Sequence, residues 1–176
     1  MTKWYRFRFR GDEHRGPNTY YADEDDLRGV DYMHLKMGRW QANWDTDASL
    51  RASPECDGDL EDVLENVLVL PVFSARLREA LEREGLGNGA IQYLPVRVFH
   101  HDGEEIPGYA IANIINMVDA RDRDARTLTL RAAALEGHDI ARLTDRFPPV
   151  LVSQRFADFF RECGFTGAIC DPLPTV

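Results

Sequence analysis

The chain has 176 residues, of which 44% are hydrophobic and 29% are charged, values typical of a soluble globular protein of about one domain. Its net charge of −9 argues against nucleic acid as a partner, because phosphate binding requires a clustered basic surface. An acidic surface can attract a basic protein partner, although most acidic proteins are merely soluble.

The first residues, MTKWYRFRFRGDE, contain no apolar run, so we expect neither a signal peptide nor a membrane span, and a cytoplasmic protein. Within this segment, residues 3–10 alternate in character. Tyr5, Phe7 and Phe9 would share one face, which predicts a half-buried strand. The other face would carry Trp4, Arg6, Arg8 and Arg10. Three arginines on one face could contact phosphates, but a solvated face is the more ordinary interpretation.

Two polar segments and one aromatic segment follow. Residues 18–28 and 48–62 are predicted as loops, because they are rich in acidic, Ser, Pro and Gly residues. Between them, residues 32–44 (YMHLKMGRWQANW) are predicted to form one or two short strands around Gly38.

One pattern then occurs twice. An apolar run (68–73 and 150–152) predicts a strand, a serine (Ser74 and Ser153) follows it, and the next residues have the periodicity of an amphipathic helix. Glycine ends each predicted helix, and Gly-Ala-Ile returns as a second strand. Four further pairs of positions correspond: Arg76 and Arg155, Gly85 and Gly164, Leu86 and Phe165, and Gly89 and Gly167.

Between the two copies, residues 91–99 and 109–115 predict an antiparallel pair joined by a turn, and residues 127–131 predict another short strand. The fold class is therefore α+β. It combines a mixed or antiparallel sheet with two serine-capped amphipathic helices, which come from a repeated strand–helix–strand unit.

The order of these motifs resembles a bacterial immunity protein family. Its members form the eleventh class of polymorphic-toxin immunity proteins, first described as a domain of unknown function. The resemblance rests on the two serine-capped segments and on GYAIANIINMVDARDR between them, and it covers residues 64–170. It implies one domain over residues 1–176, with a variable β-rich part (1–63) and a repeat-bearing core (64–176).

The resemblance also implies a function. Family members bind and neutralise a toxin encoded by an adjacent gene and used in competition between bacteria, for example through type VI secretion. We therefore expect a cytoplasmic inhibitor that works by stoichiometric occlusion, with a cognate toxin as its partner. We expect no enzymatic activity, no nucleic-acid or membrane partner, and no cofactor or metal.

Catalytic alternatives stay open at this stage. His100, His101 and Asp102 lie where a turn is predicted, and Ser74 and Ser153 stand at helix-cap positions rather than in a nucleophile motif. The three cysteines, Cys56, Cys163 and Cys170, have no metal-ligand spacing and indicate no disulfide framework. The alternatives are an enzyme with His100, His138 or Cys163 in a site between the two units, and a scaffold module of a secretion apparatus.

The candidate partner-binding residues fall into two groups. Two acidic loops could steer a basic toxin, although charge runs are usually only solvated: Asp23, Glu24, Asp25 and Asp26, and then Asp57, Asp59, Glu61 and Asp62. Large side chains near them in sequence could anchor the complex: Arg39, Trp40 and Trp44, with Tyr20 and Tyr21.

Overall fold

The computed structural model describes residues 3–10, 20–21, 32–44, 47–54, 56, 60–145 and 148–176. The elements, in chain order, are β1 (Trp4–Phe9), β2 (Tyr20–Tyr21), α1 (Tyr32–Lys36), β3 (Ser49–Ala52), β4 (Val72–Ser74), α2 (Ala75–Arg83), β5 (Ile91–Pro95), β6 (Arg97–Phe99), β7 (Glu105–Ile106), β8 (Tyr109–Ile114), β9 (Met117–Val118), the 3-10 helix η3 (Ala132–Leu135), β10 (Ile140–Leu143), β11 (Val150–Ser153), α3 (Gln154–Glu162) and β12 (Ala168–Leu173).

The strands form three sheets. Their orders are β12-β1-β11-β10-β9, β2-β3-β6-β7 and β4-β8-β5. Most neighbours are antiparallel, and the β9–β10 and β3–β6 pairs are parallel. The predicted α+β class with mixed and antiparallel pairing is therefore confirmed.

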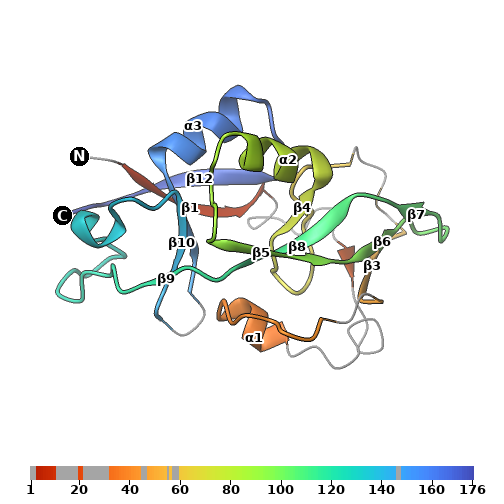
Figure 1. Ribbon diagram of the computed structural model, residues 1–176, viewed down its shortest axis with the longest axis horizontal. Helices are drawn as coiled ribbons and strands as arrows, with labels where there is room; N and C mark the ends of the chain where they lie inside the picture. Colours follow the sequence, from red (N-terminus) through yellow and green to blue (C-terminus); the bar gives the residue numbers. More distant parts are fainter. Residues whose placement is uncertain are drawn as a thin grey trace.

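Two of the sheets have the same local connectivity. β4 and β5 both pair antiparallel with β8, and α2 connects them. β11 and β12 both pair antiparallel with β1, and α3 connects them. Figure 1 shows α2 and α3 next to each other on one side of these strands.

Local chemistry explains where the two longer helices begin. The Ser74 hydroxyl accepts a hydrogen bond from the Leu77 N–H over 3.1 Å, and the Ser153 hydroxyl accepts one from the Phe156 N–H over 3.2 Å. These bonds satisfy amides of the first turn that have no partner within the helix.

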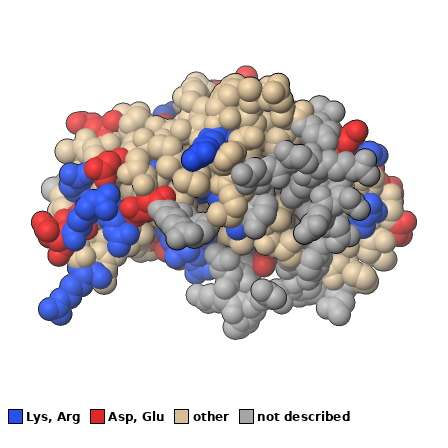
Figure 2. All heavy atoms as spheres, turned by 90° about the horizontal axis from the view of Figure 1, so that it is seen from below, with Lys and Arg blue, Asp and Glu red and all other residues tan. Residues whose placement is uncertain are grey.

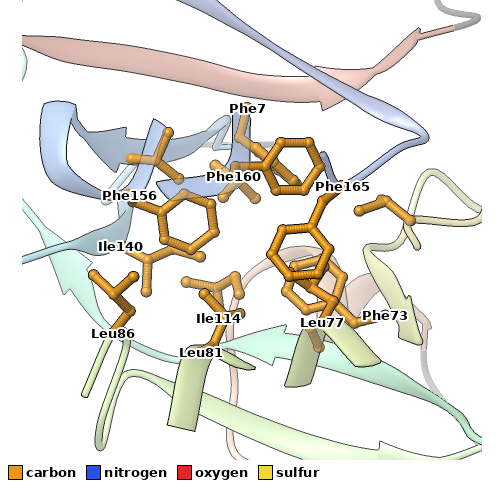
Figure 3. Packing of buried hydrophobic residues seen from close by; sticks show 14 of the residues in the cluster. Phe7, Phe73, Leu77, Leu81, Leu86, Ile114, Ile140, Phe156, Phe160 and Phe165 are labelled. Carbon is orange, nitrogen blue, oxygen red and sulfur yellow. The ribbon is translucent and has the colours of Figure 1, made fainter. Parts of the chain in front are cut away.

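The main core lies between the helices and the strands (Figure 3). Phe7 from β1 meets the rings of Phe156 and Phe160 from α3 edge-on, with centroids 5.7 and 5.4 Å apart. From α2, Leu77 and Leu81 are fully buried in the same cluster. Burying each such side chain contributes roughly 1.5–3 kcal/mol, so this cluster fixes both helices to the sheets.

The prediction of strands in residues 32–44 is wrong, because this segment contains helix α1. The N–H groups of Met37, Gly38 and Arg39 donate to the carbonyls of Met33, Leu35 and His34, which closes the last turn of the helix. Gly38 has φ +63°, the left-handed conformation in which helices commonly end. The glycine that we interpreted as the centre of a strand pair is therefore a helix stop.

Other boundaries also differ from the predictions. The predicted loop 48–62 contains β3, and the apolar run 68–73 becomes strand only from Val72. The run 91–99 divides into β5 and β6, which belong to different sheets. Within the predicted strand 127–131, Leu130 forms only isolated bridges. None of the helices in the described part of the chain could span a membrane.

Candidate partner-binding surface

Six of the predicted acidic residues lie outside the described residues: Asp23, Glu24, Asp25, Asp26, Asp57 and Asp59. The two other acidic candidates, Glu61 and Asp62, are described. The face in Figure 2 shows acidic and basic side chains intermixed at one end, with no separate acidic patch among the residues coloured there.

The side chain of Asp62 is only 8% exposed. Its carboxylate accepts hydrogen bonds from the Ser74 hydroxyl over 2.8 Å, from Arg76 Nη1 over 2.7 Å and from the Thr166 N–H over 3.1 Å. The group that we expected to face a partner is thus used inside the fold, at the N-terminus of α2.

Asp139 does the same at α3. Its carboxylate accepts from the Ser153 hydroxyl over 2.9 Å and from Arg155 Nη1 over 3.0 Å. Prediction from the sequence missed both networks, although a signal was present. An aspartate precedes the capping serine by 12 residues in one segment and by 14 in the other.

Each network also reaches the opposite helix. Arg76 Nη2 donates to the carbonyl of Cys163, which ends α3, over 2.8 Å. Arg155 Nη2 donates to the carbonyl of Glu84, which ends α2, over 2.6 Å. A guanidinium at a helix C-terminus is favourable because the last carbonyls carry partial negative charge. The side chains at the start of each helix are therefore engaged in hydrogen bonds within the fold, including those of Ser74, Ser153 and Asp139.

Glu61 lies beside Asp62 and is half-buried. Burial raises the pKa of the Glu61 carboxyl, and the negative charges of Glu65 and Asp62 raise it further, while Arg10 lowers it. The Tyr109 hydroxyl donates to the Glu61 carbonyl over 2.8 Å and fixes the backbone here. Glu61 therefore has a fixed backbone, and its half-buried carboxyl lies near acidic neighbours.

Trp40 is 64% exposed, a high value for so large an apolar side chain. The backbone on both sides of it is fixed. Gln92 accepts from the Gln41 N–H over 2.9 Å and donates to the Gln41 carbonyl over 2.7 Å. Asn113 Nδ2 donates to the Arg39 carbonyl over 2.8 Å. An exposed indole on a fixed backbone is suited to binding, since little backbone conformational entropy remains to be lost.

The other large candidates are placed differently. The Arg39 side chain is exposed, with Nη1 2.9 Å from His34 Nε2. Trp44 is half-buried against a second core cluster, which includes Leu50, Leu64 and Val98, and donates from Nε1 to the Pro95 carbonyl over 2.6 Å. Tyr20 is buried in that cluster, where burial raises the pKa of its hydroxyl, so it does not lie at the surface.

A cavity of about 690 Å³ contains one residue of the catalytic alternative, His138, together with Asp139 and Ser153. His100 and Cys163 are not among the described residues that line it. The Ser153 oxygen already donates to Asp139 and accepts from the Phe156 N–H, and His138 Nδ1 lies 3.2 Å from Asn116 Nδ2. Ser153 is thus engaged as a helix cap rather than by a histidine base. The described residues include no group of three or more His, Cys, Asp or Glu side chains suited to a metal ion.

Residues 5–136 match the model of an immunity protein family (Imm11). The match spans three quarters of the sequence, and the chain belongs to this family. The matched range differs from residues 64–170, over which we expected the resemblance. It begins earlier, at Tyr5 in β1, and it ends before β10, α3 and β12. No curated protein matches the sequence.

Proposed function

We propose that this protein is an immunity protein that binds a cognate toxin and neutralises it by stoichiometric occlusion. Membership of the immunity protein family supports this proposal. The observation that indicates a binding surface is Trp40, an exposed indole on a backbone fixed by Gln92 and Asn113. Tryptophan and arginine are the residues most often found at the energetic centre of protein interfaces.

The proposed binding surface is centred on Trp40 and Arg39, with Glu61 and the acidic residues at 23–26, 57 and 59 contributing charge. An excess of negative charge raises the association rate with a basic partner from roughly 10⁵–10⁶ toward 10⁸ M⁻¹s⁻¹ at low salt. Rapid association suits an inhibitor that must act before its toxin does damage. Because its carboxylate is internal, we assign Asp62 a structural role instead.

The finer parts of the proposal concern the partner and its context. The toxin would be encoded by the adjacent gene, would act in competition between bacteria, and would be met in the cytoplasm. The immunity protein would need no cofactor, metal, nucleic acid or membrane, and would catalyse no reaction of its own.

We also propose that β4–α2–β5 and β11–α3–β12 are two copies of one unit within a single domain of residues 1–176. The matching Ser–Asp–Arg networks and the reciprocal contacts at the helix ends support this interpretation. In this view residues 64–176 are a rigid frame, and residues 1–63 supply most of the toxin-specific surface.

Co-expression with the product of the neighbouring gene tests the function. We expect rescue of cells that express the toxin, and a 1:1 complex in light scattering. Two matched variants each remove an exposed apolar side chain: Trp40→Ala is the test and Val176→Ala is the control. Only Trp40→Ala should reduce rescue. Rescue without complex formation would indicate an enzyme, and binding without rescue would indicate a scaffold module.

A further inference from the structure

A second cavity, of about 520 Å³, lies at the C-terminal end of β1 and the start of β11. Four cationic side chains are among the residues that line it: Arg6, Arg8, Lys36 and Arg142. The rest of the described lining is apolar and comes from β1, from Val69 and Pro71, from Leu128 and from the segment Pro148–Val150. No acidic side chain occurs among these described lining residues. A basic cavity is unexpected in a chain with net charge −9.

Arg142 of β10 is the deepest of these cations and is only 5% exposed. Its Nη1 donates to the carbonyls of Lys36 and Pro148, each over 3.1 Å, and its Nε is buried with no hydrogen-bond partner. The described residues give it no carboxylate. A buried charge without a counter-ion destabilises a fold, so the guanidinium is suited to an anion supplied from outside.

The cation at the mouth of the cavity is also available. The Arg6 side chain is exposed and forms no hydrogen bond or ion pair with the described residues. Arg8, by contrast, is paired with Asp171. Arg6 can therefore attract an anion toward Arg142 without breaking an internal contact.

The rim at Val69 has two unusual properties. Val69 is 56% exposed and has φ +55°, a conformation that is strained for a β-branched residue. Asn66 enforces the turn, because its side chain donates to the carbonyls of Leu64 and Leu70 and accepts from the Leu70 N–H. Strain that is maintained at an exposed apolar position is typical of a binding site.

We propose that this cavity receives an aspartate or glutamate side chain of the toxin, whose apolar neighbours pack on Val69. The proposal rests on the proposed immunity function and adds a second contact of opposite charge to the acidic surface. A carboxylate carried by a bound toxin reaches the cavity because the rest of the interface holds it there. A free anion, in contrast, would have to approach a protein of net charge −9 unaided. An acidic group in the toxin would thus distinguish it from generally basic proteins.

Titration calorimetry with a catalytically inactive form of the toxin domain encoded by the neighbouring gene tests this inference. We expect Arg6→Glu to weaken binding about tenfold, and Val69→Gly about fivefold, because each removes part of the cavity mouth. Val69→Gly should leave the melting temperature equal or higher, since glycine accepts the positive φ. The controls, Arg83→Glu and Val176→Gly, should bind within twofold of the unchanged protein.

The outcomes separate the two proposals. If the unchanged protein does not bind the toxin, both the function and this inference fail. If it binds, but Arg6→Glu and Val69→Gly bind like their controls, only the inference fails. Sodium phenylacetate, an apolar carboxylate, should compete weakly with the toxin. If phenylacetate binds tightly and Arg6→Glu abolishes its binding but leaves toxin binding unchanged, the cavity binds a small ligand and the inference is wrong.

Discussion

Arg155 donates to the carbonyl of Glu84 at the end of α2, and Arg76 makes the corresponding bond to Cys163 at the end of α3. Each arginine contacts an aspartate at the N-terminus of its own helix and a backbone carbonyl at the C-terminus of the other helix. The two helices are therefore joined at both ends by charge-assisted hydrogen bonds, which are stronger than bonds between neutral groups.

This relationship predicts that Arg76→Gln and Arg155→Gln have nearly equal effects. Both side chains are more than half exposed, so each loss should lower the free energy of unfolding by only about 1 kcal/mol. Urea denaturation measures the effect. Arg83→Gln, on the exposed side of α2, is the control and should change little. A large loss for one arginine and none for the other would contradict the equivalence of the two units.

Trp40→Ala should weaken toxin binding by about 2 kcal/mol, roughly thirtyfold, while the free energy of unfolding changes by less than about 0.5 kcal/mol. The indole is exposed, so its removal leaves no cavity. Trp44→Ala is the matched variant with the opposite expectation. It should lower stability by about 1–3 kcal/mol, since Trp44 packs on the core and donates to Pro95. Unimpaired binding by Trp40→Ala would exclude the proposed anchor.

Glu61→Gln should raise the melting temperature at neutral pH. Burial raises the pKa of the Glu61 carboxyl, so the folded protein binds its proton more tightly than the unfolded chain does. Stability from this group is present at pH values below its ordinary pKa and is lost as pH rises through the raised value. Solvent screens the half-exposed carboxyl, so the gain stays below about 1 kcal/mol.

Melting curves recorded at pH values below and above the pKa of Glu61 check the direction of this change in stability. The advantage of Glu61→Gln should be largest at neutral pH and absent in acid. The same variant should associate more slowly with a basic toxin at low salt, whereas Glu136→Gln, an exposed acid on another part of the surface, should be neutral in both respects. A pH-independent gain would show that ionisation is not its cause.

Gly38→Ala should lower stability by about 2–5 kcal/mol. A Cβ atom at this position would lie 2.4 Å from the Ile114 carbonyl oxygen, and the backbone has a positive φ. Gly89→Ala separates the two causes. Gly89 also has a positive φ, but a Cβ there would meet nothing within 4 Å, so the expected loss is only about 1 kcal/mol. Thermal denaturation of both proteins gives the comparison, and equal losses would rule out the close approach.

The parts of the fold that could be predicted are those whose signal is local. Alternation in KWYRFRFR predicts β1, and periodic apolar residues predict α2 and α3. The segment around Gly38 has no such signal, because α1 has five residues and its end is fixed by contact with β8 and β10. Tertiary contact, not periodicity, decides the structure there.

The candidate site was predictable only in part. Trp40 could be proposed from its residue type, but the backbone beside it is fixed by Gln92 and Asn113, which are distant in sequence. The cavity at Arg142 could not be predicted, because its lining comes from segments spread between Arg6 and Val150. An arginine within the strand sequence IARL gives no sign of being buried without a counter-ion.

The position of β1 has a consequence for how the molecule is assembled. This strand lies between β11 and β12 in the five-stranded sheet and pairs with both. During synthesis β1 can pair with neither neighbour until β11 and β12 have been made, and contacts so distant in sequence slow the search for the native state. We therefore expect the five-stranded sheet to form last. Loss of β1, or loss of the segment that contains β11 and β12, should have the same result, because either loss leaves this sheet incomplete.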